Sequence, residues 1–125
     1  MAKVERFEEL ECWQEARALT RRIYRLTGHG NFARDFAFRD QIRRASVSVM
    51  SNIAEGFERN ALAEYARHLD IARGSCGEVR SMYYAAEDLG YVTPEVAVQR
   101  RKRAKKIARG ISALAHKLRD RSSEP

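Results

Sequence analysis

The chain has 125 residues, of which 44% are hydrophobic and 33% are charged, and its formal net charge is +7. This length suits one domain with a hydrophobic core, so we expect residues 1–125 to form a single domain. The uncharged stretch at residues 45–54 is only half as long as the roughly 20 residues that a membrane span requires. We therefore expect no membrane partner, and the positive charge directs attention to nucleic acids and other anionic surfaces.

The cysteines and the N-terminus favour a cytoplasmic protein. Cys12 and Cys76 lie far apart inside helical patterns, which is typical of free thiols in a reducing compartment. The first residues, MAKVERFEELE, lack the apolar segment of a signal peptide. Cytoplasmic localisation is the resulting expectation.

Hydrophobic residues recur every three or four positions in the first half of the chain, which is the spacing of one helix face. This pattern predicts a helix at residues 7–27, and Gly28 and Gly30 are expected to end it. An aromatic connector at residues 32–38 follows, and its three phenylalanines are expected to cover the end of the helical core. The next predicted helix is at residues 39–59.

The second half of the chain holds two longer helical patterns. The first, residues 61–89, has a heptad spacing of hydrophobic residues and follows Asn60, a residue type that often caps helices. Gly90 is expected to end this helix. Thr93, followed by proline, predicts the start of the last helix, at residues 94–119.

These patterns give an all-α chain of four helices with a tail at residues 121–125. Four amphipathic helices with short connections favour an antiparallel, up-down-up-down four-helix bundle. A different packing of the same helices is the alternative.

The predicted helix at residues 39–59 has an unusually wide hydrophobic face. Ile42 and Ile53 lie on its central line, and a neighbouring strip of Val47, Met50 and Ala54 widens it to about half of the helix circumference. We predict that this strip contacts another subunit of a homo-oligomer. A helix buried deeply in a monomer would explain the same pattern, and both explanations stay open.

Several polar and small residues interrupt these apolar faces. Asn52, Glu55 and Gly56 are unfavourable in an apolar helix, and Asn52 borders the hydrophobic face, where its amide can bond to another helix. We interpret them as architectural residues rather than as a ligand site. In the next helix Gly74 and Ser75 predict a close approach of another helix.

Five short motifs resemble the 23S rRNA intervening sequence protein family, whose members are also called four helix bundle proteins. They are Trp-Gln-Glu-Ala at 13–16, Gln-Ile-Arg-Arg-Ala at 41–45, Asn-Ile-Ala-Glu-Gly at 52–56, Ala-Arg-Gly-Ser at 72–75 and Leu-Gly-Tyr at 89–91. The resemblance covers residues 7–92. The last predicted helix, residues 94–119, contains none of these motifs and is similar to the family only in its general character.

The resemblance implies a four-helix bundle that assembles as a homopentamer. It places Gln41 and Arg44 with Asn52, Glu55 and Gly56 in the structural motif, and it implies no catalytic residue. Some family members are encoded in insertions within 23S rRNA genes. A related accessory protein of diversity-generating retroelements is a basic pentamer that works with a reverse transcriptase and nucleic acid.

The residues that usually carry enzyme chemistry form no recognisable pattern. His29, His68 and His116 lie in different segments. Glu64 and His68 share a helix face, but a di-iron bundle requires Glu-x-x-His twice and two further carboxylates. We therefore expect no catalytic residue, no metal and no cofactor.

Residues 100–109, RRKRAKKIAR, contain seven basic residues and no acid, which equals the net charge of the whole chain. Arg100 is expected to lie towards the apolar side and to extend its charged end into solvent. The outward face of this segment holds Lys102, Lys105, Lys106 and Arg109. We predict that these four side chains bind RNA or DNA phosphates without sequence specificity. The alternative is a solvated helix face on a protein-interaction adaptor that does not bind nucleic acid.

Overall fold

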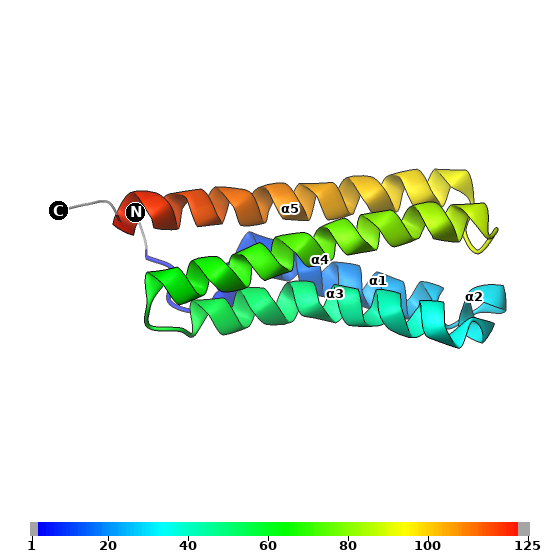
Figure 1. Cartoon of the computed structure of the whole chain (residues 1–125), viewed down its shortest axis with the longest axis horizontal. Helices are drawn as coiled ribbons and strands as arrows, with labels where there is room; N and C mark the ends of the chain where they lie inside the picture. Colours follow the sequence, from blue (N-terminus) through cyan, green and yellow to red (C-terminus); the bar gives the residue numbers. More distant parts are fainter. Residues whose placement is uncertain (1–2, 123–125) are drawn as a thin grey trace.

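The computed structural model describes residues 3–122, and in this range it contains helices and no strand (Figure 1). The long helices are α1 (Glu11–Leu26), α3 (Phe36–Phe57), α4 (Leu62–Asp88) and α5 (Pro94–Ser122). A short 3-10 turn, η1 (Phe7–Glu9), precedes α1, and the short helix α2 (Gly30–Arg34) joins α1 to α3. The all-α prediction is confirmed. None of the helices in residues 3–122 is long and apolar enough to cross a membrane.

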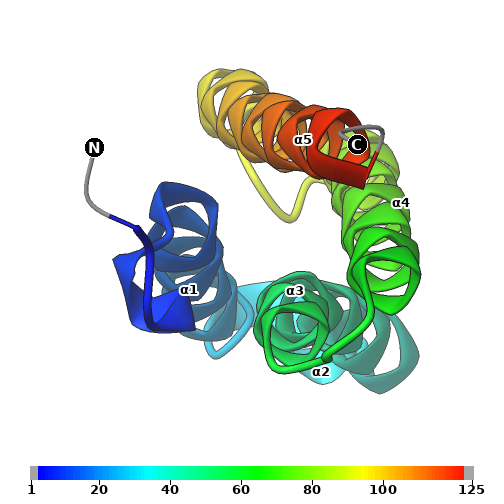
Figure 2. The same ribbon diagram turned by 90° about the vertical axis from the view of Figure 1, so that its left-hand side faces the viewer.

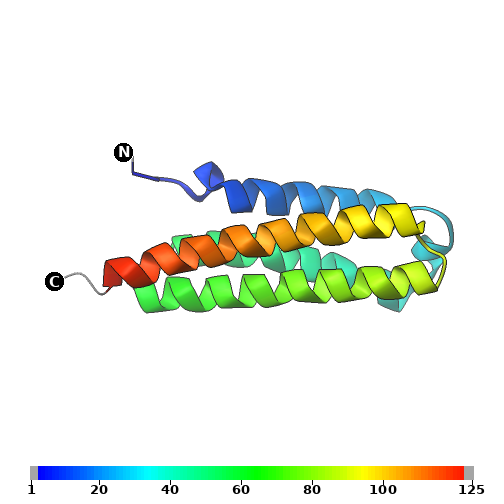
Figure 3. The same ribbon diagram turned by 90° about the horizontal axis from the view of Figure 1, so that it is seen from above.

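The four long helices surround a shared core, and successive helices run in opposite directions (Figure 1). Seen end-on, α3 lies between α1 and α4, and α5 lies beside α4 (Figure 2). Seen from above, α1 runs along one side of α5 and α4 along the other (Figure 3). The contact between α1 and α5 is the loosest of the four, which leaves an opening between these two helices. Surface pockets between α1 and α5 occupy this opening.

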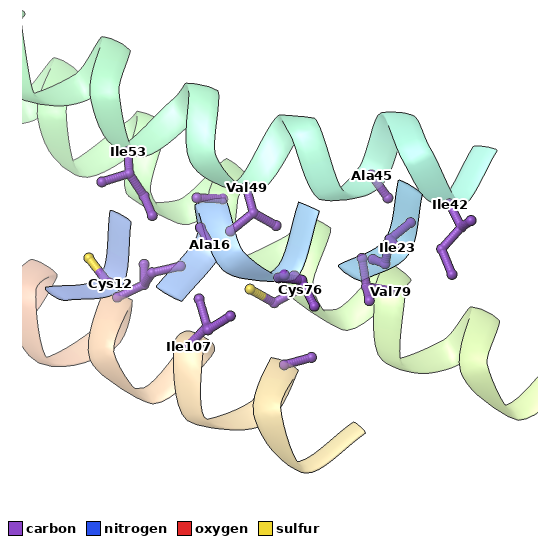
Figure 4. Packing of buried hydrophobic residues seen from close by; sticks show 14 of the residues in the cluster. Cys12, Ala16, Ile23, Ile42, Ala45, Val49, Ile53, Cys76, Val79 and Ile107 are labelled. Carbon is purple, nitrogen blue, oxygen red and sulfur yellow. The ribbon is translucent and has the colours of Figure 1, made fainter. Parts of the chain in front are cut away.

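Hydrophobic side chains from every long helix meet in the core (Figure 4). The fully or almost fully buried examples include Ala16, Leu19 and Ile23 of α1, Ile42, Val49 and Ile53 of α3, and Ile107 and Ile111 of α5. The heptad positions of α4 are buried as well, from Tyr65 to Ala86. Each large aliphatic side chain removed from water contributes about 1.5–3 kcal/mol to folding, so this core is the main source of stability.

The second long helix, α3, begins earlier than the sequence pattern predicts. Helix α3 starts at Phe36, before the expected residue 39, because the Asp35 carboxylate accepts a hydrogen bond from the Phe38 backbone N–H at 3.2 Å. This is N-capping, which satisfies a free N–H of the first helical turn. The Tyr91 hydroxyl donates to the same carboxylate at 2.7 Å. Asp35 therefore ties the start of α3 to the α4–α5 connection.

The other helix ends give mixed results. The prediction for Thr93 is confirmed, because its hydroxyl accepts a hydrogen bond from the Val96 N–H at 3.2 Å. Gly90 also ends α4 as expected, with a positive φ of 73°. The Asn60 prediction is wrong, since Ala61 occupies the N-cap of α4 and makes no side-chain cap bond. Gly28 does not have the expected left-handed conformation, because the positive φ falls on Gly30 instead.

The aromatic connector covers the core end only in part. Phe32 is buried, and its ring lies 5.4 Å from that of Phe38 and 5.1 Å from that of Tyr91, measured between centroids. Phe36 is 64% exposed, so the expectation that all three phenylalanines pack inward is wrong. Its ring instead lies under the Arg39 guanidinium, 4.8 Å from the centroid.

Candidate functional site

A row of polar contacts joins α3 to α4, at the positions that the sequence marks as architectural. Three side-chain hydrogen bonds cross between the helices, and they join Gln41 to Glu78 at 3.2 Å, Ser48 to Ser75 at 2.8 Å and Asn52 to His68 at 2.9 Å. The partners descend along α4 as the numbers rise along α3, as antiparallel helices require. A shift of one helix along the other would break all three bonds, so the row favours one register.

Asn52 and His68 form the buried part of this row. The Asn52 amide nitrogen donates to the Ser48 carbonyl at 2.9 Å, which leaves its Oδ1 to accept from His68 Nδ1. This arrangement shows that Nδ1 of the His68 imidazole carries a proton. The His68 side chain is only 8% exposed, and Glu55 Oε2 lies 3.8 Å from the same nitrogen. The polar pair is thus satisfied on the Nδ1 side inside an otherwise apolar contact.

Of the glycines in the described chain, Gly56 leaves the least space for a side chain, because α3 and α4 lie close together there. A β-carbon at this position would lie 2.8 Å from His68 Cβ, 3.0 Å from Tyr65 Cδ1 and 3.2 Å from the Tyr65 carbonyl oxygen. These distances are too short for ordinary contacts. The absence of a side chain at residue 56 therefore permits this packing.

Two other predicted motif residues lie outside the tight contact. A β-carbon at Gly74 would meet no atom within 4 Å, so the prediction of a close approach at Gly74 is wrong for the single chain, because this residue faces outward. Arg44 is also exposed, beside the row at Gln41 and Ser48. Ser75, in contrast, does contact α3 through Ser48.

The predicted subunit-contact strip on α3 is only partly accessible. Val47 is 37% exposed, whereas Met50 and Ala54 are half-buried, and Met50 packs against the core of its own chain. The strip therefore offers a narrow apolar surface.

The four predicted phosphate-binding residues, Lys102, Lys105, Lys106 and Arg109, are exposed on α5. We call them the α5 basic stripe. None of these four side chains forms an ion pair or a hydrogen bond with another residue in the range 3–122. Arg101 differs, because its guanidinium pairs with Glu87 at 3.1 Å and lies over the Tyr84 ring at 3.9 Å. The stripe consequently carries charge that no neighbouring carboxylate of the described chain neutralises by contact.

An apolar pocket separates part of this stripe from α1. It has a volume of about 450 Å³, and Leu10, Cys12 and Ile107 contribute to its lining. Lys106 and Arg109 border it from α5, and acidic side chains of α1, Glu11 and Glu15, border it from the other side. The acids are close enough to weaken the positive potential here, but they do not pair with the stripe.

Sequence reasoning missed a second group of cations at the opposite end of the α1–α5 opening. A pocket of about 460 Å³ lies there, and we call it the arginine notch. It is lined by Arg22, Arg25 and Leu26 of α1, by His29 of the connection that follows, and by Arg100 of α5. Burial lowers the pKa of Arg22, and the nearby cations Arg103, Arg100 and Arg21 lower it further. Glu15 acts in the opposite direction and has the smallest effect. The cations therefore repel one another across the two helices.

Of the buried polar atoms without a hydrogen-bond partner in the described chain, one belongs to Arg100, which lines the arginine notch, and another to Tyr83, which is not a lining residue. These two atoms are the Arg100 Nε and the Tyr83 hydroxyl. Burial raises the pKa of Tyr83 to about 12, and Arg100 and Arg22 oppose this shift, which shows that both cations lie near the phenol. The hydroxyl is therefore a neutral donor at pH 7, and buried donors are normally paired.

Residues 8–113 match the sequence model of the 23S rRNA-intervening sequence protein family. The chain belongs to this family. The match passes the end of the motif resemblance at residue 92 and includes most of α5, so the family pattern also covers the α5 basic stripe.

A solved structure supports the fold. It is the crystal structure of a protein of unknown function from the S23 ribosomal protein family of Bacteroides thetaiotaomicron. The two chains are 19% identical and align with a TM-score of 0.78 over 84% of this chain and 95% of that chain. At this identity the similarity shows a shared fold alone. No curated protein sequence matches the chain.

The histidine, carboxylate and cysteine side chains of the described residues have the following surroundings. Among residues 3–122 no three His, Cys, Asp or Glu side chains are arranged to hold a metal ion. Glu64 pairs with Arg67 at 3.3 Å, and the His68 Nδ1 faces Asn52. Burial raises the pKa of Cys76 to about 12, so this thiol is protonated and unreactive at neutral pH.

Replacing Asn52 by alanine is expected to lower the free energy of unfolding by about 1–3 kcal/mol, because a buried His68 N–H loses its acceptor. Urea unfolding monitored by circular dichroism measures the change. Gln41→Ala is the control, since its bond to Glu78 is exposed and its loss should change stability by less than about 0.5 kcal/mol. Equal effects of the two substitutions would show that the buried pair has no special structural role.

Proposed function

We propose that this protein is a small basic four-helix-bundle scaffold that assembles as a homo-oligomer and binds RNA or DNA phosphates without sequence specificity. The observation that carries the proposal is the α5 basic stripe, whose four exposed cations have no ionic partner in the described chain. Unpaired cations along a rigid helix are suited to phosphate contact, because binding releases the counterions of the nucleic acid. The reference to 23S rRNA in the family description fits a role alongside RNA.

The length of the stripe matches a nucleic acid backbone. Lys102 and Arg109 are seven residues apart, or about 10 Å along a helix with a rise of 1.5 Å per residue. A duplex carries about one negative charge per 1.7 Å of its axis, so several phosphates lie within this length. Side chains that contact only phosphates position a protein on the backbone and do not read the bases.

An oligomer would repeat the stripe on each subunit and strengthen a weak interaction through multivalency. We expect five subunits, as the family resemblance implies, with the α3 strip at the interface. Light scattering coupled to gel filtration measures the mass. Replacing Val47 and Ala54 by glutamate should dissociate the oligomer, because two charges would enter an apolar contact. The control is Ile71→Glu, which adds a charge at another exposed hydrophobic residue and should leave the mass unchanged.

A monomeric wild-type protein at micromolar concentration would contradict the oligomer. A mass that stays unchanged in the Val47 and Ala54 variant would contradict the proposed interface.

The second candidate function is a protein-interaction adaptor without nucleic-acid binding. The apolar pocket between α1 and α5 favours it, because exposed apolar grooves often receive partner helices. Binding of generic RNA distinguishes the two functions. A scaffold with phosphate contacts binds RNA in low salt, whereas a pure adaptor does not.

A further inference from the structure

The arginine notch combines features of a small anion site. Its basic residues come from three parts of the chain, namely Arg22 and Arg25 near the end of α1, His29 of the following connection, and Arg100 near the start of α5. Its volume of about 460 Å³ lies within the range of about 300–1,000 Å³ that is usual for small-ligand sites. None of the five residues that line it in the described structure is acidic.

The local charges and donors lack internal partners. The guanidinium groups of Arg22 and Arg100 repel each other, and Arg103 adds to this repulsion. The buried Tyr83 hydroxyl and the Arg100 Nε have no hydrogen-bond acceptor among the described residues. One anion with several acceptor oxygens would reduce the repulsion and accept hydrogen bonds from the arginines that line the notch, Arg100 included.

We propose that the arginine notch binds the terminal phosphate of a nucleic acid strand, a phosphomonoester, and this inference rests on the proposed nucleic-acid function. A phosphomonoester carries about −1.5 to −2 charges at pH 7, whereas each phosphodiester of the backbone carries about −1. Coulombic attraction rises with the charge of the ligand, so a pocket lined by three arginines favours the terminal group. Arginine also binds phosphate through two parallel N–H donors.

The notch and the α5 basic stripe can act on one strand. Arg100 and Lys106 are six residues apart on α5, or about 9 Å along its axis. If the end of a strand binds in the notch, the phosphodiesters that follow it would therefore lie along the α5 basic stripe. The notch would then distinguish strand ends, while the stripe would supply attraction that does not depend on sequence.

The test uses the full chain and three fluorescent RNA tetranucleotides of one sequence, with a 5′-phosphate, with a 3′-phosphate, or with hydroxyls at both ends. Anisotropy at one low salt concentration gives the affinities. We expect one phosphorylated form to bind about tenfold tighter than the unphosphorylated form, as additional charge-assisted bonds allow. AMP, a free phosphomonoester, serves as a competitor.

The variant Arg22→Gln with Arg100→Gln should lose the preference for a terminal phosphate and still bind the unphosphorylated strand. The matched control, Arg44→Gln with Arg59→Gln, removes the same charge from exposed positions on α3 and on the connection that follows it, and should keep the preference. Circular dichroism checks folding. If the double variant does not fold, Arg25→Gln at an exposed position of the notch should reduce the preference instead.

Four results would overturn the proposal. Wild-type protein that binds the three tetranucleotides equally has no terminal-phosphate site, although the proposed function would stand. A preference that survives in the notch variant, or that the control also loses, places recognition elsewhere. AMP binding without any effect of a terminal phosphate on RNA affinity would indicate a site for free nucleotides. Failure to bind any of the RNAs would contradict both this inference and the proposed function.

Discussion

Replacing Gly56 by leucine is expected to lower the free energy of unfolding by about 3 kcal/mol, at the upper end of the usual cost of overpacking a core. The β-carbon alone would lie 2.8 Å from His68 Cβ and 3.2 Å from the Tyr65 carbonyl oxygen. Because one of these neighbours is backbone, a rotamer change cannot make enough room, and α3 must move away from α4. That movement would also stretch the hydrogen bond between Asn52 and His68. Urea unfolding measures the loss.

Gly74→Leu is the matched control for this experiment. A β-carbon at Gly74 meets no atom within 4 Å, and leucine is a better helix former than glycine by about 0.5–1 kcal/mol. The control should therefore be neutral or stabilising. Similar destabilisation by both substitutions would contradict the close approach at Gly56.

Reversing the charge of the α5 basic stripe, by changing Lys102, Lys105, Lys106 and Arg109 to glutamate, is expected to abolish RNA binding in low salt. Each substitution replaces a phosphate-binding cation by a group that repels phosphate. All four side chains are exposed, so the helical content and the oligomer mass should persist. Anisotropy with a generic RNA measures binding, and circular dichroism and light scattering measure the fold and the assembly.

A second quadruple variant separates a local site from the effect of total charge. Changing Arg44, Arg59, Arg67 and Arg73 to glutamate alters the net charge by the same amount at exposed positions on α3, on α4 and on the connection between them. It should weaken binding much less than reversal of the stripe. Equal losses would mean that total charge, and not the stripe, attracts the nucleic acid. Unchanged binding in the stripe variant would reject the proposed surface.

Local patterns explain why the helices were predictable. The hydrophobic spacing is set by the helical repeat, and Gly90 and Thr93 mark an end and a start through their own backbone and side-chain chemistry. The start of α3 was misplaced because Asp35 caps it, and this residue lies within an aromatic connector whose spacing indicates no clear helix. Errors at helix ends thus arise where one polar contact outweighs the hydrophobic pattern.

For the buried pair in the polar row between α3 and α4, the sequence indicated the residue on α3 and not its partner on α4. Asn52 stands out in the sequence as an amide beside an apolar face, whereas His68 draws notice only through its spacing from Glu64, because a periodicity of hydrophobic residues omits a buried histidine. Its partner is fixed by the register of the two helices. Gly74 was misread for a similar reason, since a glycine in a helix does not reveal which way it faces.

The arginine notch could be recognised only from the three-dimensional arrangement of the helices. Arg22 and Arg100 are distant in sequence and meet because α1 ends at the same end of the molecule where α5 begins (Figure 1). The available signal was that Arg100 lies towards the apolar side of its helix. Pairing that observation with the antiparallel order of the helices would have directed attention to the basic residues at the end of α1.

The salt dependence of RNA affinity tests the central claim most directly. If four cations of the stripe each neutralise a phosphate, the logarithm of the association constant should fall with the logarithm of the salt concentration at a slope of about −3 to −4. The stripe variant should lose this dependence together with binding. A slope near zero for the wild-type protein, or no RNA binding in low salt, would contradict phosphate binding and favour the adaptor function.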